Sequence, residues 1–286
     1  MPEGHTTHAL AARLNHGFEG SPVSVSSPQG RFAAGAAQLD GLILIEALAW
    51  GKHLFAQFDQ ERWLNVHLGL IGKFSVTRRP DGLVPVQGQV RLRLLNEQWV
   101  GDLRAPTVCQ VITAQKVDQI KARLGPDPLV PGADPDLAMH RISRSARPIA
   151  ELLMDQGVLA GIGNVYRCEV LFRHRVDPFR PGREIRPATW LAIWDDLVAL
   201  MPLGVAFGQV LTIDDQVALA CAEVADGSAA PHTETLTGAR PGERFERRFY
   251  VYKRTGEPCR VCGTRVRTQL VAGRNLFWCG RCQRRR

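Results

Sequence analysis

Hydrophobic and polar residues alternate along much of the stretch from Phe18 to Thr113, and turns containing glycine interrupt the alternation. A period of two places successive side chains on opposite faces of a strand, so this pattern predicts strands with one buried face. We expect strands at residues 42–50, 53–58, 63–67, 73–76, 90–95 and 108–113. Short strands joined by tight turns are typical of an antiparallel β-domain, here most simply a sandwich.

A helical period describes the start of the chain and most of its second half. Residues 6–15 predict a short amphipathic helix with Leu10 and Leu14 facing inward. Three more helices are expected, at 149–154, at 165–172 after the cap residue Asn164, and around the inward-facing Trp190, Trp194, Leu197 and Met201.

Two stretches show neither the period of a strand nor the period of a helix. The run from Gly125-Pro126-Asp127-Pro128 to Asp134-Pro135 predicts an interdomain linker. Residues 212–243 are rich in Ala, Gly, Asp and Thr, and we expect much of this segment to be mobile.

The composition of 286 residues with 45% hydrophobic side chains suffices for one large or two ordinary domains. We find no run of about twenty apolar residues, which argues against a membrane span. The start, Met1-Pro2-Glu3-Gly4-His5, lacks the basic and apolar regions of a secretory signal. Cys109, Cys168 and Cys221 have no framework spacing and predict reduced thiols, so we expect a cytoplasmic protein.

Positive charge is concentrated at the end of the chain. Residues 244–286 hold thirteen Lys and Arg against two Asp and Glu, a net charge of +11, whereas the whole chain carries +8. The remainder therefore carries −3. A basic module of this kind is typical of a surface that lies on nucleic-acid phosphates, although the terminal Arg284-Arg285-Arg286 also fits a solvated tail.

Four cysteines near the end have the spacing of a metal site. Cys259 and Cys262 form one Cys-x-x-Cys pair, and sixteen residues later Cys279 and Cys282 form another. Two such pairs at the ends of a hairpin predict a tetrahedral zinc site with four thiolates. With no open position, the ion folds the segment and does no chemistry. The alternative, a pair of redox dithiols, lacks the strand and helix context that such a motif needs.

Several other residues are candidates for chemistry. Removal of Met1 would leave Pro2 with a free secondary amine, and an α-amino group titrates near 8, well below the value of about 10.4 for lysine. Glu3 follows it near the start of a helix, where Pro and Glu are also ordinary helix-starting residues. Lys52 lies at a hairpin turn, and Leu70 lies in a loop flanked by glycines as either a core residue or a wedge.

Taken together, these features resemble the formamidopyrimidine-DNA glycosylase and endonuclease VIII family. The resemblance rests on Met1-Pro2-Glu3-Gly4, Lys52, Met154-Asp155-Gln156, Gly161-Ile162-Gly163-Asn164 and the four-cysteine hairpin, and it covers the chain from end to end. The first four residues and the run Arg274-Asn275-Leu276-Phe277-Trp278-Cys279 are similar to the endonuclease VIII branch of actinobacterial type.

The resemblance implies an α+β multidomain fold. Its expected parts are an N-terminal β-sandwich catalytic domain with flanking helices at 1–124, a linker at 125–135, a helical DNA-binding domain with a helix–two-turn–helix element at 136–245 and a zinc finger at 246–286. The implied partners and cofactors are damaged DNA and one structural Zn²⁺, with no catalytic metal. We expect a monomer that has no membrane partner and associates with the nucleoid through DNA.

The resemblance also implies a mechanism. Proteins of this family flip a damaged base out of duplex DNA and attack the sugar C1′ with the terminal proline. Pro2 would be the nucleophile and Glu3 the acid and base. Lys52 would contact phosphate and assist β-elimination, while Arg274 on the finger would promote δ-elimination. Asn164 would hold a phosphate.

Three further contacts are weaker expectations. Leu70 falls where the family inserts a residue into the hole left by the flipped base. Arg144 and Arg147 are candidate phosphate contacts, although solvated arginines before a helix fit the sequence equally well. We assign no role to His5, which stands where relatives commonly have proline, or to His8.

The family's purine-specific branch carries an Arg-Arg-Phe-Gly loop that this chain lacks, since the matching residues are Leu103-Arg104-Ala105-Pro106-Thr107-Val108. We therefore expect excision of oxidised pyrimidines such as thymine glycol and dihydrouracil, with oxidised purines as the alternative. A binder of damaged DNA without catalysis, or a zinc-ribbon accessory protein, would leave Pro2 and Glu3 without a purpose.

Overall fold

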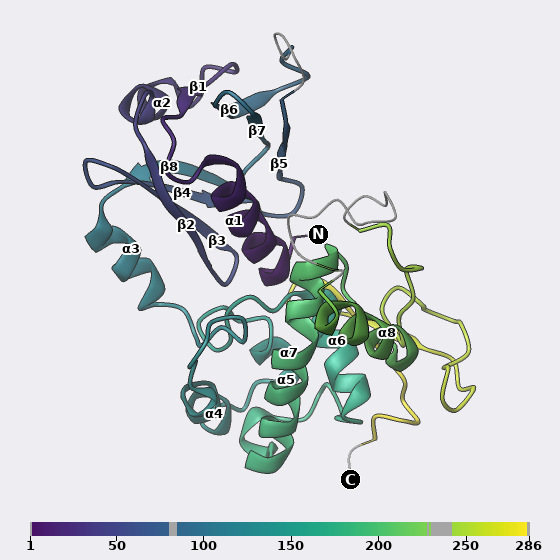
Figure 1. The fold of residues 1–286 in the computed structure, drawn as a ribbon. Helices are drawn as coiled ribbons and strands as arrows, with labels where there is room; N and C mark the ends of the chain where they lie inside the picture. The colour runs from purple at the N-terminus through teal and green to yellow at the C-terminus, as the bar shows by residue number, and fades with distance from the viewer. Residues whose placement is uncertain (1, 80–84, 228, 230–241, 285–286) are drawn as a thin grey trace. The chain divides into compact units, whose positions relative to one another are not determined.

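The computed structural model describes residues 2–79, 85–227, 229 and 242–284. The chain divides into two compact units, Met1–Arg123 and Leu124–Arg286. Figure 1 shows the strands of the first unit in purple to blue, and the helices of the second in teal and green.

The first unit contains two antiparallel sheets of four strands each, with strand orders β1-β6-β7-β5 and β2-β3-β4-β8. The strands are β1 (Ser24–Ser26), β2 (Leu44–Trp50), β3 (His53–Phe58), β4 (Arg62–His67), β5 (Lys73–Arg78), β6 (Val90–Leu95), β7 (Trp99–Arg104) and β8 (Val108–Ile112). The helices are α1 (Gly4–Phe18), α2 (Ala33–Leu39) and α3 (Ala114–Lys121). The sequence-based prediction of a β-sandwich with flanking helices is confirmed.

Helix α1 supplies one side of the core of the first unit. It contacts β2 and β3 of one sheet and β5 and β7 of the other. Leu10 and Leu14 are 3% and 0% exposed, as the helical period predicted, and Phe18 is fully buried. The helix therefore fixes the position of the chain's first residues against both sheets.

Strand β7 is the main element that the alternation missed. Its central four residues are all buried, so no alternation of polar and apolar positions marks it. Asp102 is buried there because Arg93 of β6 donates two hydrogen bonds to its carboxylate, at 2.7 and 2.8 Å. The ion pair places a charged residue where the pattern requires an apolar one.

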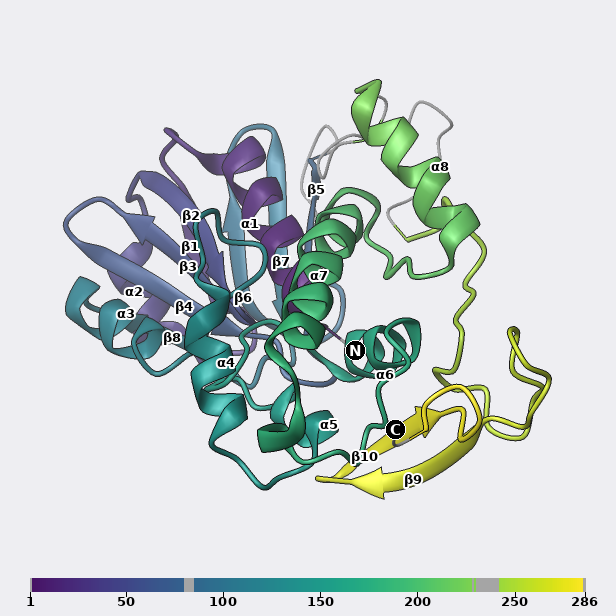
Figure 2. The same ribbon diagram turned by 90° about the horizontal axis from the view of Figure 1, so that it is seen from below.

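The second unit is helical and ends in a two-stranded hairpin. Its elements are α4 (Pro135–Ser143), α5 (Ile149–Leu152), α6 (Asn164–Arg173), the short 3-10 helix η1 (Gly182–Glu184), α7 (Pro187–Phe207), α8 (Asp214–Ala225), β9 (Arg267–Val271) and β10 (Arg274–Trp278). One hydrophobic core joins the helices to the hairpin, including Tyr166 and Trp190 from the helices and Leu276 from β10. Figure 2 shows β9 and β10, in yellow, beside the end of the chain.

Helix α7 buries Trp190, Trp194, Leu197 and Met201, as predicted. Among the residues that the structure describes, it is the one helix long and apolar enough to cross a membrane by length and composition. The helix contains Asp195 and Asp196, so it is not an unbroken run of apolar residues. Half of its most apolar window is buried inside this unit, as is usual for a core helix.

Residues 212–243 show little periodicity in the sequence, and within them Asp214–Ala225 forms helix α8. Only Gln216 and Ala220 of this helix are buried, so the sequence shows little periodicity. Ala220 belongs to a small hydrophobic cluster with Leu203, Phe207 and Phe245. Ion pairs also join the helix to the segment that follows it, with Arg248 bound to Asp215 at 3.0 Å and Arg244 bound to Glu223. The expectation of mobility at 230–241 falls outside the described residues.

Candidate active site and zinc centre

The first residues of the chain place a carboxyl group beside the proposed nucleophile. Pro2 is partly exposed, and Glu3, which is 0% exposed, occupies the position before helix α1. The Glu3 carboxylate makes no capping hydrogen bond, while its backbone oxygen accepts from Thr6 N at 2.9 Å. A carboxyl group at a helix start is favoured by the helix dipole, and Glu3 directly follows Pro2 in the chain.

His5 is a buried group that the sequence did not identify as important. It lies on the inward face of α1 and is 5% exposed. Burial lowers the pKa of its imidazole to about 3, so His5 is neutral at ordinary pH. A neutral imidazole adds no positive charge to this end of the helix.

Lys52 lies in the two-residue turn between β2 and β3, as the sequence predicted. Trp50 pairs with His53 across the turn, and Gly51 takes the positive φ of +59° that the first position of such a turn requires. A two-residue turn between paired strands has little freedom. The strand pairing therefore fixes the backbone from which Lys52 projects.

Two histidines near Lys52 were missed by the sequence reasoning. His53 and His67 are opposite each other on β3 and β4, with ring centroids 4.9 Å apart. Burial, together with the neighbouring His53 and Lys52, lowers the pKa of His67 to about 4. Their common face follows from strand register, which a single sequence does not contain.

The loop after β4 presents two apolar side chains to solvent. Leu70 is 53% exposed and Ile71 is 83% exposed, which places Leu70 outside the core. The sequence reasoning named only Leu70. Gly69 adopts a φ of +69°, and a Cβ there would overlap Thr107 Oγ1. The loop therefore needs glycine where the chain approaches the β7–β8 turn.

Asn164 does not cap helix α6, contrary to the prediction, because Gly163 is the cap residue and Asn164 is the first helical residue. Its side chain is turned to the finger hairpin, where Nδ2 donates to Asn275 O at 2.9 Å. The buried Arg167 donates to Asn164 Oδ1 and to Asn275 O. The amide of Asn164 is thus oriented by two partners.

Arg274 is the first residue of β10, directly after the turn that joins the two finger strands. Ala272 and Gly273 both have positive φ, at +48° and +72°, as tight hairpin turns of this kind require. Arg274 is partly exposed and its Nη1 donates to Gly273 O at 3.2 Å. Its guanidinium therefore projects from the tip of a rigid hairpin.

Arg144 and Arg147 differ in the ion pairs that their guanidinium groups form. Arg147 binds Asp155 at 2.9 Å and Glu151 at 3.4 Å, and these carboxylates raise its pKa. Arg144 ends helix α4, is exposed, and forms no ion pair with any residue in the described part of the chain. Of the two, Arg144 has the guanidinium that is available to a phosphate.

The structure brings the four predicted sulfur ligands together. The Sγ atoms of Cys259, Cys262, Cys279 and Cys282 all lie within 4.8 Å of one another. Two of the separations are 3.9 Å, between Cys259 and Cys282, and 3.5 Å, between Cys262 and Cys279. A tetrahedral zinc with Zn–S bonds of about 2.3 Å requires sulfur separations of about 3.8 Å, so the cluster suits a closed structural site.

Backbone hydrogen bonds shape both cysteine pairs. Gly263 N donates to Cys259 O at 2.9 Å in the first pair, and Gln283 N donates to Cys279 O at 3.0 Å in the second. The amide of Gln283 also accepts from Cys279 N and donates to Val176 O. This side chain fastens the metal site to the helical part of the unit.

Glu169 is a buried anchor that sequence reasoning also missed. Its carboxylate accepts hydrogen bonds from the backbone N–H groups of Tyr250, Val251 and Tyr252 at 2.8 to 2.9 Å. The Thr212 hydroxyl donates a fourth at 2.7 Å. Glu169 therefore holds the segment that leads into the zinc finger.

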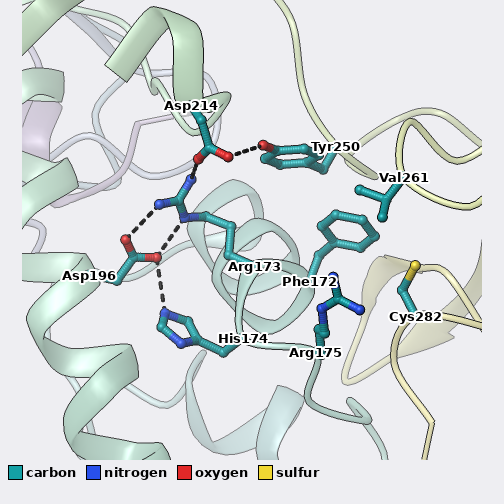
Figure 3. A pocket seen from close by; sticks show the side chains of 9 residues that line it. All are labelled: Phe172, Arg173, His174, Arg175, Asp196, Asp214, Tyr250, Val261 and Cys282. Carbon is teal, nitrogen blue, oxygen red and sulfur yellow. Dashed lines mark hydrogen bonds and ion pairs between the residues drawn. The ribbon is translucent and has the colours of Figure 1, made fainter. Parts of the chain in front are cut away.

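A cavity of about 280 Å³ lies at the far end of α6 from Asn164. Figure 3 shows Arg173 between Asp196 and Asp214, with His174 bound to the first of these carboxylates and Tyr250 to the second. The acids are thus satisfied by neighbouring side chains. The cluster links α6, α7 and α8 and contains no arrangement suited to catalysis.

The candidate residues are distributed over both units. Pro2, Glu3, Lys52 and Leu70 belong to the first, and Asn164, Arg274 and the cysteines to the second. The first unit has a carboxyl group directly after Pro2 and a lysine on a two-residue turn. The second has an arginine at the tip of a hairpin and four clustered thiols.

Family models match three parts of the chain. They are the formamidopyrimidine-DNA glycosylase N-terminal domain at residues 1–109, the H2TH domain of the same glycosylase at 124–215 and the zinc finger found in FPG and IleRS at 256–285. The Endonuclease 8 1 of Mycobacterium tuberculosis is 49% identical over 99% of this chain and 100% of its own length. The formamidopyrimidine-DNA glycosylase of Geobacillus kaustophilus is 30% identical over 82% of this chain and 79% of its own.

The fold has a counterpart among solved structures. The Lactococcus lactis Fpg in complex with DNA containing an abasic site superposes with a TM-score of 0.77, at 20% identity, and covers 99% of this chain and 100% of that one.

Proposed function

Because the chain belongs to the formamidopyrimidine-DNA glycosylase and endonuclease VIII family and is a DNA glycosylase with abasic-site lyase activity, we propose that it excises oxidised pyrimidines through Pro2. The observation that carries this proposal is the fully buried Glu3 directly after Pro2 at the start of α1. An amine and a carboxyl group at adjacent positions supply the nucleophile and the proton donor that sugar chemistry needs.

In the proposed reaction the Pro2 nitrogen attacks C1′ of the damaged nucleotide, and the bond from C1′ to the base breaks. The proton that the attacking amine gives up goes to the leaving base. Glu3 protonates the ring oxygen, so the sugar opens to an iminium in which Pro2 nitrogen is bonded to C1′. The cation draws electrons from C2′, which loses a proton as the 3′ phosphate leaves. A second proton loss expels the 5′ phosphate, and water hydrolyses the iminium to release the sugar fragment and free Pro2. The product is a one-nucleotide gap with phosphate at both ends.

Basic and polar side chains from both units would bind the DNA phosphates. We assign Lys52 to a phosphate contact that assists the first elimination, Arg274 to the second, and Asn164 to a phosphate held at the start of α6. Arg144 supports a further contact because its guanidinium is exposed and forms no ion pair with a described residue. Arg147 is the weaker candidate because two carboxylates already bind it.

The preference for pyrimidines is supported by the short connection between β7 and β8. Only Ala105, Pro106 and Thr107 separate the two strands, which leaves no long loop to read the opposite base. The alternative, excision of oxidised purines, is favoured by the likeness to a protein named formamidopyrimidine-DNA glycosylase. Excision of thymine glycol or dihydrouracil, compared with 8-oxoguanine in the same duplex, decides between them.

We further propose one structural zinc on the four cysteines, no catalytic metal, a monomer, and action in the cytoplasm on the nucleoid. The zinc would fold the finger and so aim Arg274, with no part in the chemistry. Damaged DNA is the partner that the basic final segment fits.

The test is borohydride trapping of the untagged protein, with Met1 removed, on duplex DNA that holds one abasic site. The wild type is expected to form a covalent adduct, and Pro2→Gly is expected to lose it while still binding DNA. A Cys259→Ser control should lose zinc and damage-specific binding together. A wild type that binds DNA in a zinc-dependent manner but gives no adduct would refute the chemistry and favour a damage sensor.

A further inference from the structure

The wedge loop, defined here as Gly69-Leu70-Ile71, exposes its two apolar side chains but is tightly held at its base. Gly72 N donates to Leu68 O at 3.1 Å, which closes the loop on itself. Thr107 N donates to His67 O at 2.9 Å, which ties the start of the loop to the β7–β8 turn. The apolar tips therefore stand on a fixed backbone.

One side chain takes part in this fixation. His67, the last residue of β4, accepts a hydrogen bond on Nδ1 from Gly69 N at 3.1 Å. Gly69 has a φ of +69° and lies against Thr107 Oγ1, so its backbone has little room to move. The imidazole thus holds the first residue of the wedge loop directly.

The hydrogen bond from Gly69 N determines which ring nitrogen of His67 carries the proton. Because Nδ1 accepts a hydrogen, the ring proton must lie on Nε2 in the neutral form. Burial lowers the pKa of His67 to about 4, with His53 and Lys52 acting in the same direction, so the neutral ring persists at ordinary pH. The ring is also packed against His53, which contacts Asn65 Oδ1 through Nδ1 at 3.3 Å.

We propose that His67 is a positioning residue for base eversion, whose Nδ1 holds Gly69 N and thereby sets the position from which Leu70 and Ile71 enter the base stack. This inference rests on the proposed function of Leu70 as a wedge. Displacing a stacked, paired base costs free energy that an abasic site does not demand. The hydrogen bond should therefore matter for excision of a base and much less for cleavage of an abasic site that already exists.

Three substitutions of His67 test the roles of its two ring nitrogens separately. The Oδ1 of His67→Asn takes the place of Nδ1 and accepts from Gly69 N, whereas His67→Gln replaces Nε2 and leaves Gly69 N without its acceptor. His67→Leu removes both. Lost hydrogen bonds of this kind correspond to about tenfold in rate.

The measurement is the ratio of two single-turnover rates, excision of dihydrouracil and cleavage of a preformed abasic site, in otherwise identical duplexes. We expect the ratio to fall about tenfold in His67→Gln and His67→Leu and to recover in His67→Asn. Leu70→Ala should lower it similarly, and adding His67→Gln to Leu70→Ala should lower it no further, because both changes affect one step.

Different outcomes overturn different claims. Equal losses in both rates for His67→Gln and His67→Leu, or no recovery in His67→Asn, would show that His67 acts outside the wedge loop and refute this inference. An unchanged ratio in Leu70→Ala would refute the wedge itself. Failure of the proposed reaction through Pro2 would be seen separately, since Pro2→Gly would then still cleave both duplexes.

Discussion

Glu169 offers a quantitative test of how the zinc finger is fastened. Its carboxylate accepts three backbone N–H groups and one hydroxyl while being completely buried. In Glu169→Gln, the remaining carbonyl oxygen can keep Val251 N and Tyr252 N. The new NH₂ group then faces Tyr250 N, another donor, which is left without an acceptor.

The cost follows from this geometry. An unpaired buried N–H costs about 1–3 kcal/mol, and the remaining bonds each lose the strength that a charged acceptor gives, on the order of 1 kcal/mol. Relief from burying a charge offsets part of the loss. We therefore expect Glu169→Gln to lower the free energy of unfolding of the second unit by about 2–4 kcal/mol.

The assay is urea unfolding followed by tryptophan fluorescence at a fixed concentration of free zinc, because bound metal contributes to stability. Glu257→Gln is the matched control, since the same substitution there removes only an exposed ion pair with Arg254, worth about 0.5 kcal/mol or less. Equal effects of the two substitutions would show that the four hydrogen bonds of Glu169 do not determine the stability of this unit.

Further expectations concern the wedge loop, the finger and pH. Gly69→Ala should destabilise the protein more than Gly20→Ala in thermal unfolding, because both have positive φ but only Gly69 lacks room for a Cβ; equal losses would contradict the clash. Arg274→Ala should reduce the slope of log binding constant against log salt by about 1 on duplex DNA, and an unchanged slope would argue against a phosphate contact. Burial lowers the pKa of His67 to about 4 and that of His5 to about 3, from an ordinary value of 6.5. The stability linked to their neutral forms is complete above pH 6.5 and is lost as pH falls towards 4, so unfolding midpoints should drop over this window; a flat profile would contradict the assigned burial.

The sequence predicted the elements whose energetics are local. Alternation identified most strands of the sandwich, and the spacing of Cys259, Cys262, Cys279 and Cys282 predicted the cluster that the structure brings together. A two-residue turn fixed the place of Lys52. In each case residues close together in the chain determine the local structure.

The elements and residues that the sequence did not predict all depend on partners that are distant in the chain. Strand β7 was missed because Asp102 is buried through Arg93 of another strand. Helix α8 was missed because it buries only Gln216 and Ala220, whose partners come from other segments of the chain. The pairing of His53 with His67 depends on strand register. Glu169 looked like an ordinary helical residue, since its partners lie more than forty residues further along the chain.

Helix α6 ties together the two proposed phosphate contacts of the second unit. Asn164 Nδ2 donates to Asn275 O, the residue next to Arg274, and Cys168 Sγ accepts from Phe277 N at 3.5 Å. Because α6 binds the backbone of β10, replacing Asn164 removes a proposed phosphate contact and also loosens the strand that carries Arg274. Asn164→Ala and Arg274→Ala should therefore be non-additive by at least about 0.5 kcal/mol in affinity for an abasic duplex. Strict additivity would mean that the finger holds Arg274 in place without help from α6.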